Sequence, residues 1–240
     1  LSKASIIAAG LIILNRFPAE ALGPYFVYTS YAILMTKFGD WGIGRLNIIL
    51  TESTREYVVS FSSILFFRLF FSAAFVVATL IIAPNVADPL VYILIVVQYD
   101  LAAYYLLFSS NFDKSGKFKT KMTFDFIQNF SVLAYVAVQT VIMDNLDILT
   151  LVLGVAACKG AALGIMVLYQ GPRPGKLVLS RQDLAAVFGN GLNLFIISVC
   201  IAMYSRIGFV LLQHFSVDMV SIGGYGKIAR LMVDVAFVAT

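Results

Sequence analysis

The sequence predicts an all-α integral membrane protein. Of its 240 residues, 60% are hydrophobic and only 12% are charged, whereas about a quarter of the residues in ordinary soluble domains are charged. The mean hydropathy is +0.91, and the apolar residues form long runs separated by short polar segments. Because a helix needs about 20 apolar residues to cross a bilayer, these runs predict a bundle of about eight spanning helices.

Four spanning helices are expected in the first half of the chain, at about residues 1–15, 25–38, 57–83 and 90–109. The segment 16–24 contains Pro18, Gly23 and Pro24, a combination typical of a turn. The next connection, 39–56, is longer and rich in glycine and polar residues. Pro84 ends the third helix, because proline cannot continue a helix without losing a backbone hydrogen bond.

Four more helices are expected at about 122–143, 148–169, 184–212 and from 219 to the end. Gly160 and Gly164 are spaced four apart within the sixth helix, which favours close approach of a neighbouring helix. The segment 171–183 combines proline, glycine and basic residues and is the clearest linker in the chain. Since the chain opens and closes within apolar runs, we expect it to be a piece of a longer protein.

The charge distribution predicts the orientation. With the amino terminus in the cytoplasm, eleven basic residues in the loops and at the helix ends fall on the cytoplasmic side and only Arg16 falls on the other, in agreement with the positive-inside rule. The net charge of +4 therefore reflects membrane topology and does not indicate nucleic-acid binding. Cys158 and Cys200 lie in apolar segments, so neither a disulfide framework nor a metal site is expected, and no cofactor motif is present.

Seven charged residues inside the predicted spans are candidates for function. Charges at membrane depth are costly and normally face a bundle interior or a wet cavity. The cations are Arg68, Lys159, Arg206, Lys227 and Arg230, and the acids are Asp100 and Asp234. Lys227, Arg230 and Asp234 are three and four residues apart, which places them on one face of a helix. We expect the cations to bind substrate and the acids to act in ion pairs or coupling.

Two alternatives stay open for this set. Arg68 and Asp100 lie at similar depths in neighbouring helices. Either they form a structural ion pair, or Arg68 faces a central cavity. Arg230 and Asp234 either neutralise each other or contribute to the same cavity, and Lys159 has no obvious acid except Asp100. Even when both acids are paired, about three cations need compensation. A negatively charged substrate would supply the compensating charge.

Two patches carry a family resemblance. Residues 15–48 hold an Arg after the first helix, a Gly-x-Tyr that enters the second, and an acid-x-Gly-Ile-Gly at its far end: Arg16, Gly23, Tyr25 and Asp40–Gly44. Residues 205–231 hold an Arg-Ile pair followed by Gly-x-Tyr and a later Arg-Leu: Arg206, Gly223, Tyr225 and Arg230. Both patches resemble the bacterial polysaccharide repeat-unit flippases of the multidrug/oligosaccharidyl-lipid/polysaccharide exporter superfamily. Ser205 stands where that family often has Asp.

The chain also repeats itself weakly. Residues 22–32 align with 222–232, so that Gly23 matches Gly223 and Tyr25 matches Tyr225. Parallel internal repeats are a known transporter design, and the resemblance implies a multidrug-exporter-like bundle of two lobes. We therefore expect a first lobe at 1–170, a cytoplasmic linker at 171–183 and the start of a second lobe at 184–240.

The resemblance implies a transporter rather than an enzyme. Its substrate would be a lipid-diphosphate-linked oligosaccharide, an O-antigen or exopolysaccharide repeat unit, flipped across the bacterial cytoplasmic membrane by alternating access. Besides this substrate and the bilayer, the glycan polymerisation machinery is a candidate partner. A cation-coupled multidrug exporter of the same fold is the alternative, although it should show unpaired carboxylates. A membrane-embedded glycosyl- or acyltransferase is less favoured, because the loops are short and the chain has one His and no Asp-x-Asp pair.

Overall fold

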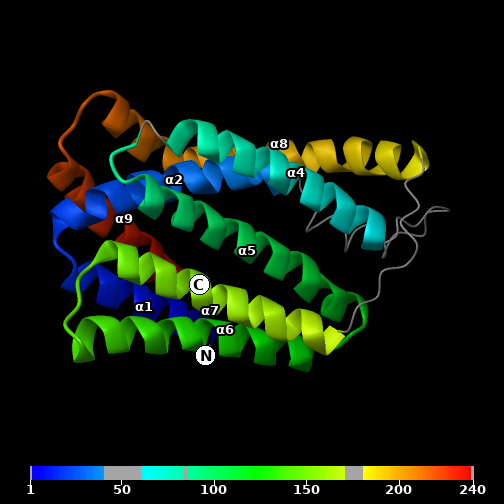
Figure 1. The fold of residues 1–240 in the computed structure, drawn as a ribbon, viewed down its shortest axis with the longest axis horizontal. Helices are drawn as coiled ribbons and strands as arrows, with labels where there is room; N and C mark the ends of the chain where they lie inside the picture. Colours follow the sequence, from blue (N-terminus) through cyan, green and yellow to red (C-terminus); the bar gives the residue numbers. More distant parts are fainter. Residues whose placement is uncertain (1, 41–60, 84–85, 171–180, 239–240) are drawn as a thin grey trace.

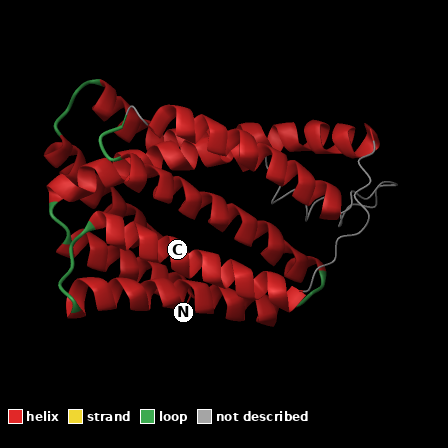
Figure 2. Cartoon of the chain, in the orientation of Figure 1, coloured by secondary structure: helices red, strands yellow, loops and turns green. Residues whose placement is uncertain are grey.

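The computed structural model describes residues 2–40, 61–83, 86–170 and 181–238, and these residues are helical apart from short turns (Figure 2). No strand occurs among them. Within this part of the chain, five helical segments are long and apolar enough to cross a membrane: Phe61–Ile82, Pro89–Lys114, Phe118–Ile142, Ile148–Gln170 and Val187–His214. The predicted all-helical, multi-pass membrane architecture is confirmed at this level.

The first connection differs from its prediction. Helix α1 spans Ser2–Arg16 and α2 spans Ala19–Asp40, with Pro24 inside α2. The turn predicted for 16–24 is present but much shorter, because only Phe17 and Pro18 separate the two helices. The backbone N–H of Leu22 donates to the carbonyl of Pro18 at 3.2 Å, so the helical hydrogen-bond pattern is established before Pro24 is reached. The missing N–H of Pro24 costs α2 one hydrogen bond, which its packing must offset.

The later helices agree with their predicted positions more closely. α4 spans Phe61–Ile82, α5 spans Pro89–Lys114, and α6 spans Phe118–Ala137 before a π-helical turn, η2, at Val138–Ile142. α7 spans Ile148–Gln170, α8 spans Arg181–His214 and α9 spans Met219–Val238. The last residues of the predicted linker form the first turn of α8, and 171–180 lie outside the described residues, as does most of the connection 39–56.

Helix α2 is the element around which the bundle is built (Figure 1). It packs against α4, α5, α8 and α9, while α7 packs on α5 and on α6, and α1 packs on α6. The main core cluster joins these helices through buried side chains that include Phe26, Val27, Ile95, Val152 and Phe209. Most other large apolar side chains of α4 and α8 point outward, for example Phe70, Ile81 and Ile201, as expected for lipid-facing surfaces.

Two glycines allow α2 and α9 to touch through their backbones. A Cβ added to Gly23 would lie 2.1 Å from the carbonyl oxygen of Met219, and a Cβ added to Gly223 would lie 1.9 Å from that of Ala19. The contact is reciprocal, because each glycine faces the residue four positions before the other. These are the glycines that the internal repeat pairs, so the weak sequence repeat coincides with a locally two-fold symmetric helix crossing.

The Gly160–Gly164 pair does not have the predicted role. A Cβ at Gly160 would make only an ordinary contact of 3.7 Å with Leu101, and a Cβ at Gly164 would have no atom within 4 Å. Close approach on α7 occurs instead at Gly154, where the ring of Tyr135 occupies the space of a side chain. Gly154 therefore serves the contact of α7 with α6, and the four-residue spacing of Gly160 and Gly164 does not mark a close helix contact.

We predict that Gly23→Ala and Gly223→Ala each destabilise the protein, because a methyl group would meet a backbone carbonyl that no side-chain rotation can move. Gly164→Ala is the matched control and should be neutral or stabilising by about 0.5–1 kcal/mol, as expected for an open position in a helix. Thermal unfolding of the purified variants measures the difference. Equal midpoints for all three variants would show that the α2–α9 crossing is looser than described.

We also predict acid-sensitive stabilisation at the start of α7. Asp147 accepts hydrogen bonds from the N–H and hydroxyl of Thr150 at 2.9 and 2.6 Å, and these bonds hold the pKa of its carboxyl below the ordinary 3.8. A lowered pKa stabilises the fold above pH 3.8, and this contribution is lost as the pH falls through the folded-state value. Asp147→Ala should therefore lower the free energy of unfolding by about 1 kcal/mol at pH 7. In unfolding measurements below pH 4, the difference between the variant and the wild type should become smaller.

Candidate functional site: a cationic cavity

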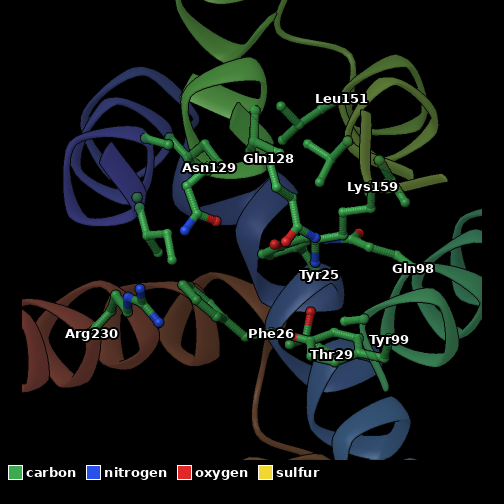
Figure 3. Close-up of a pocket in the computed structure, with 18 of the residues that line it drawn as sticks. Tyr25, Phe26, Thr29, Gln98, Tyr99, Gln128, Asn129, Leu151, Lys159 and Arg230 are labelled. Carbon is green, nitrogen blue, oxygen red and sulfur yellow. The ribbon is translucent and has the colours of Figure 1, made fainter. Parts of the chain in front are cut away.

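The helices line a partly open cavity of about 740 Å³, a size typical of small-molecule binding sites. Its lining residues come from α1, α2, α5, α6, α7, α8 and α9. α2 runs through the middle of this arrangement and contributes Tyr25, Phe26 and Thr29. Figure 3 shows side chains from several helices converging on the space. The packing of α2 against α5, α8 and α9 thus brings residues far apart in sequence to one site.

The cavity lining carries more positive than negative groups. Among the lining residues that the structure describes, the cations are Lys121, Lys159, Arg206 and Arg230, and the one carboxylate is Asp125. Lys121 is neutralised by Asp113, with an Nζ–Oδ2 distance of 2.6 Å. Asp125 accepts a hydrogen bond from the hydroxyl of Tyr105 at 2.9 Å. The other three cations of the described lining, Lys159, Arg206 and Arg230, are all among the candidates that the sequence predicted.

Lys159 is the least compensated of these cations. Its amine lies 5.4 Å from the centre of the Tyr99 ring, a cation–π arrangement, and no described carboxylate lies within 4.0 Å of it. A ring face stabilises a cation by only about 0.5–2 kcal/mol, less than the cost of placing an ammonium group in an apolar bundle. Asp100, the one acid that the sequence offered as a partner for Lys159, is instead paired with Arg68.

The two arginines come from the last two helices. Arg206 is half-buried on α8, and its Nε atom is fully buried without a hydrogen-bond partner among the described residues. Arg230 is half-buried on α9, and Figure 3 shows it across the cavity from Lys159. The side chain of Asp234 lies outside the described residues, so the predicted pairing of Arg230 with Asp234 stays a prediction.

Arg68 lies away from the cavity in a buried charge cluster. Its guanidinium pairs with Asp100 and lies 3.8 Å from Asp40, and its side chain is 1% exposed. The hydroxyl of Ser72 also donates to Asp100, and Arg68 lies 5.0 Å from the centre of the Tyr104 ring. Of the two alternatives for Arg68 and Asp100, the structure shows the ion pair. Asp40, at the end of α2, is an additional partner that the sequence did not indicate.

Lys227 is satisfied by a backbone carbonyl. Its amine donates to the carbonyl oxygen of Phe17 at 2.8 Å, and the residue does not line the cavity. Phe17 directly follows the last residue of α1, where carbonyls lack partners in the helix and attract cations. Lys227 thereby fastens α9 to the end of α1. The predicted cationic stripe on α9 is thus split, since Lys227 and Arg230 face different surroundings.

Uncharged polar residues of the lining were missed by the sequence analysis. Gln98 on α5 and Gln128 and Asn129 on α6 all line the cavity, together with Tyr25, Tyr99 and Tyr105. Each of these amides lies inside an otherwise apolar run, at residues 94–99 or 126–130. This pattern could have identified them as candidates for the lining. The cavity therefore combines cations with hydrogen-bonding and aromatic groups. No described residues form a group of three or more potential metal-ligating side chains.

We predict that the Arg68 cluster supports stability. Asp100→Asn should cost about 3–5 kcal/mol, because it leaves a buried guanidinium without its closest counter-charge. The double variant Arg68→Met with Asp100→Asn should recover part of the loss, since it removes both members of the pair. Unfolding in a detergent titration measures the cycle, with the exposed Lys119→Gln as a control. If the loss of stability in the double variant equals the sum of the losses in Arg68→Met and Asp100→Asn, the two residues are not a coupled pair.

Comparisons with known proteins do not place this chain in a family. No family model, no curated protein and no solved structure matches it. The resemblance to repeat-unit flippases therefore stays a prediction from the motifs. The function has to be argued from the residues that line the cavity.

Proposed function

We propose that the chain is part of a transporter that flips a lipid-diphosphate-linked oligosaccharide across the bacterial cytoplasmic membrane. The observation that carries the proposal is the cavity lined by Lys159, Arg206 and Arg230, with one lining carboxylate, Asp125, that is already hydrogen-bonded. Guanidinium groups bind phosphate oxygens through paired hydrogen bonds. A diphosphate headgroup has the charge and the oxygens that these cations bind.

The proposed transporter has eight spanning helices in this chain and two lobes. Helices α1, α2 and α4–α7 form the first lobe, and α8 and α9 begin the second. The reciprocal contact of Gly23 and Gly223 supports this division, because it pairs matching positions of the two repeats. Alternating access then requires α2 and α9 to separate where they now touch.

The proposed topology indicates toward which side of the membrane the cavity opens in this conformation. The short connections around Pro18 and Asp218 lie on the outer side, so the crossing of α2 with α9 closes the outer end. Lys121, next to the cytoplasmic basic loop, lines the cavity at its other end. The state is therefore the one that loads substrate from the cytoplasm. The diphosphate and the sugars of the substrate would enter the cavity while the lipid tail stays in the bilayer.

The alternative functions receive less support from the cavity. A cation-coupled multidrug exporter needs unpaired carboxylates facing its cargo, yet the described lining contributes Asp125 alone, bonded to Tyr105. A membrane-embedded transferase needs a cluster of acid–base groups, and the described lining offers no histidine and no pair of acids. The transport assay described next distinguishes the exporter from a flippase.

We predict that Arg206→Gln and Arg230→Gln each reduce flipping at least about tenfold, the effect of losing roughly 1.4 kcal/mol of binding. The assay uses proteoliposomes that contain a synthetic polyprenyl-diphosphate oligosaccharide with a fluorescent sugar. A quencher outside the vesicles reports each sugar that reaches the outer leaflet. Arg16→Gln, which changes an exposed arginine at the end of α1, is the matched control and should flip normally. Wild-type rates in both cavity variants would rule out these arginines as diphosphate ligands, and organic-cation efflux would favour the exporter.

A further inference from the structure

The tight connection between α5 and α6 carries lysines at a membrane surface. Both helices are long and apolar enough to span a membrane, and only Ser115, Gly116 and Lys117 separate them. The backbone N–H of Lys117 donates to the carbonyl of Phe112 at 2.9 Å, and Gly116 has a positive φ of 67°, so the chain reverses direction within one turn. The lysines next to this turn are therefore held at the level of the lipid headgroups.

Lys117 and Lys119 have no acidic partner in the described part of the chain. Both side chains are exposed, and no described carboxylate lies within 4.0 Å of either amine. Asp113, the acid near the end of α5, is instead bound to Lys121 at 2.6 Å. The connection between α5 and α6 therefore presents two positive charges that the described residues do not neutralise.

These two charges also lie at the unfavourable end of α6. Lys117 caps the helix and Lys119 lies in its first turn, where no acidic residue occurs and the cap makes no side-chain hydrogen bond. The first N–H groups of a helix carry a partial positive charge that favours anions over cations. The helix end and the lysines thus repel each other, and one anion bound near the start of α6 would stabilise both.

An exposed apolar face of α6 continues directly from Lys119. Phe118, Met122 and Phe130 are 59%, 69% and 51% exposed. Phe126 and Phe130 stack on each other with ring centres 5.5 Å apart. Residues three or four apart share one side of a helix, so these side chains form a row that begins at Lys119. We call this surface the lysine-edged face: Lys117, Phe118, Lys119, Met122, Phe126 and Phe130.

The lysine-edged face points away from the bundle. α6 packs on α1 and α7 and lies at the edge of the bundle in Figure 1. None of the six residues lines the cavity, although Lys121, Asp125 and Gln128 on another side of the same helix do. The face is therefore a surface separate from the proposed substrate site.

We propose that the lysine-edged face binds an anionic phospholipid, with its phosphate at the two lysines and one acyl chain along the row from Met122 to Phe130. An ammonium group forms charge-assisted hydrogen bonds with phosphate oxygens, and lysines at a membrane surface attract anionic lipids. From Lys119 to Phe130 the row extends about 16 Å along the helix, about the depth of one leaflet of the hydrocarbon core. A zwitterionic lipid offers the same acyl chains without net negative charge, so the headgroup decides which lipid is retained.

Native mass spectrometry of the purified full chain in a neutral detergent measures the binding of phosphatidylglycerol and of phosphatidylcholine with the same acyl chains. We expect phosphatidylglycerol to bind at least about tenfold more tightly. Lys117→Gln and Lys119→Gln should each reduce this preference by about fivefold, the effect of one lysine near an anionic surface, and the double variant should abolish it. Arg16→Gln, which removes one exposed charge from the end of α1, is the matched control and should retain the preference.

A second measurement locates the lipid in the wild-type protein. Phosphatidylglycerol and phosphatidylcholine that carry a photoreactive group on one acyl chain are incorporated into nanodiscs with the protein. We expect phosphatidylglycerol to label the segment that contains Met122 and Phe126 at least about threefold more than phosphatidylcholine does. Both lipids should label the exposed apolar residues of α8, such as Ile201, equally.

Equal binding of the two lipids to the wild type, equal labelling of α6, or a preference that survives in the double variant overturns the proposal. A loss in Arg16→Gln as large as that in Lys119→Gln also overturns it, because net charge would then select the lipid. If glycerophosphoglycerol, the headgroup without acyl chains, binds as tightly as the whole lipid, the lysines bind a free phosphate ester and the lipid assignment is wrong. The labelling comparison uses the wild type alone, so a variant that fails to fold does not decide it.

Discussion

The cost of placing a charge inside an apolar bundle organises this structure. The predicted intramembrane cations have different surroundings. Arg68 is paired with Asp100 and lies near Asp40, and Lys227 donates to the carbonyl of Phe17. Arg206, Arg230 and Lys159 instead line a shared cavity. The first two cations therefore have their contacts outside the cavity, and the other three contribute to its lining.

The crossing of α2 and α9 determines where those three cations meet. α2 packs against α5, α8 and α9, so it lies between the helix that holds Gln98 and Tyr99 and the two that hold the arginines. The glycines at 23 and 223 remove the side chains that would keep α2 and α9 apart. Lys227 adds a second connection between α9 and the end of α1. Together these contacts place Arg230 opposite Lys159 instead of in lipid.

Hydropathy predicted most helices because the length of an apolar run is a property of the chain alone. The turn at 16–24 is shorter than predicted, because packing of α2 on α9 overrides the local preference of Pro24 and Gly23 for a turn. Depth in neighbouring helices made the Arg68–Asp100 ion pair one of two alternatives, and the structure shows that pair. Asp40 lies at a helix end whose position the sequence left open. Residues three apart on a helix differ by about 60° in direction, which is enough to send Lys227 to α1 and Arg230 to the cavity.

The division of the cavity between two sets of helices suggests how a bound passenger would be released. Arg206 and Arg230 lie on α8 and α9, whereas Lys159, Gln98 and Gln128 lie on α5, α6 and α7. A passenger that contacts both sets is held best when the sets are close, as they are while α2 touches α9. In the proposed transporter, separation of α2 and α9 at the outer end moves the arginines away from Lys159. The passenger then loses one set of contacts as water enters, and the weakened binding favours release on the outer side.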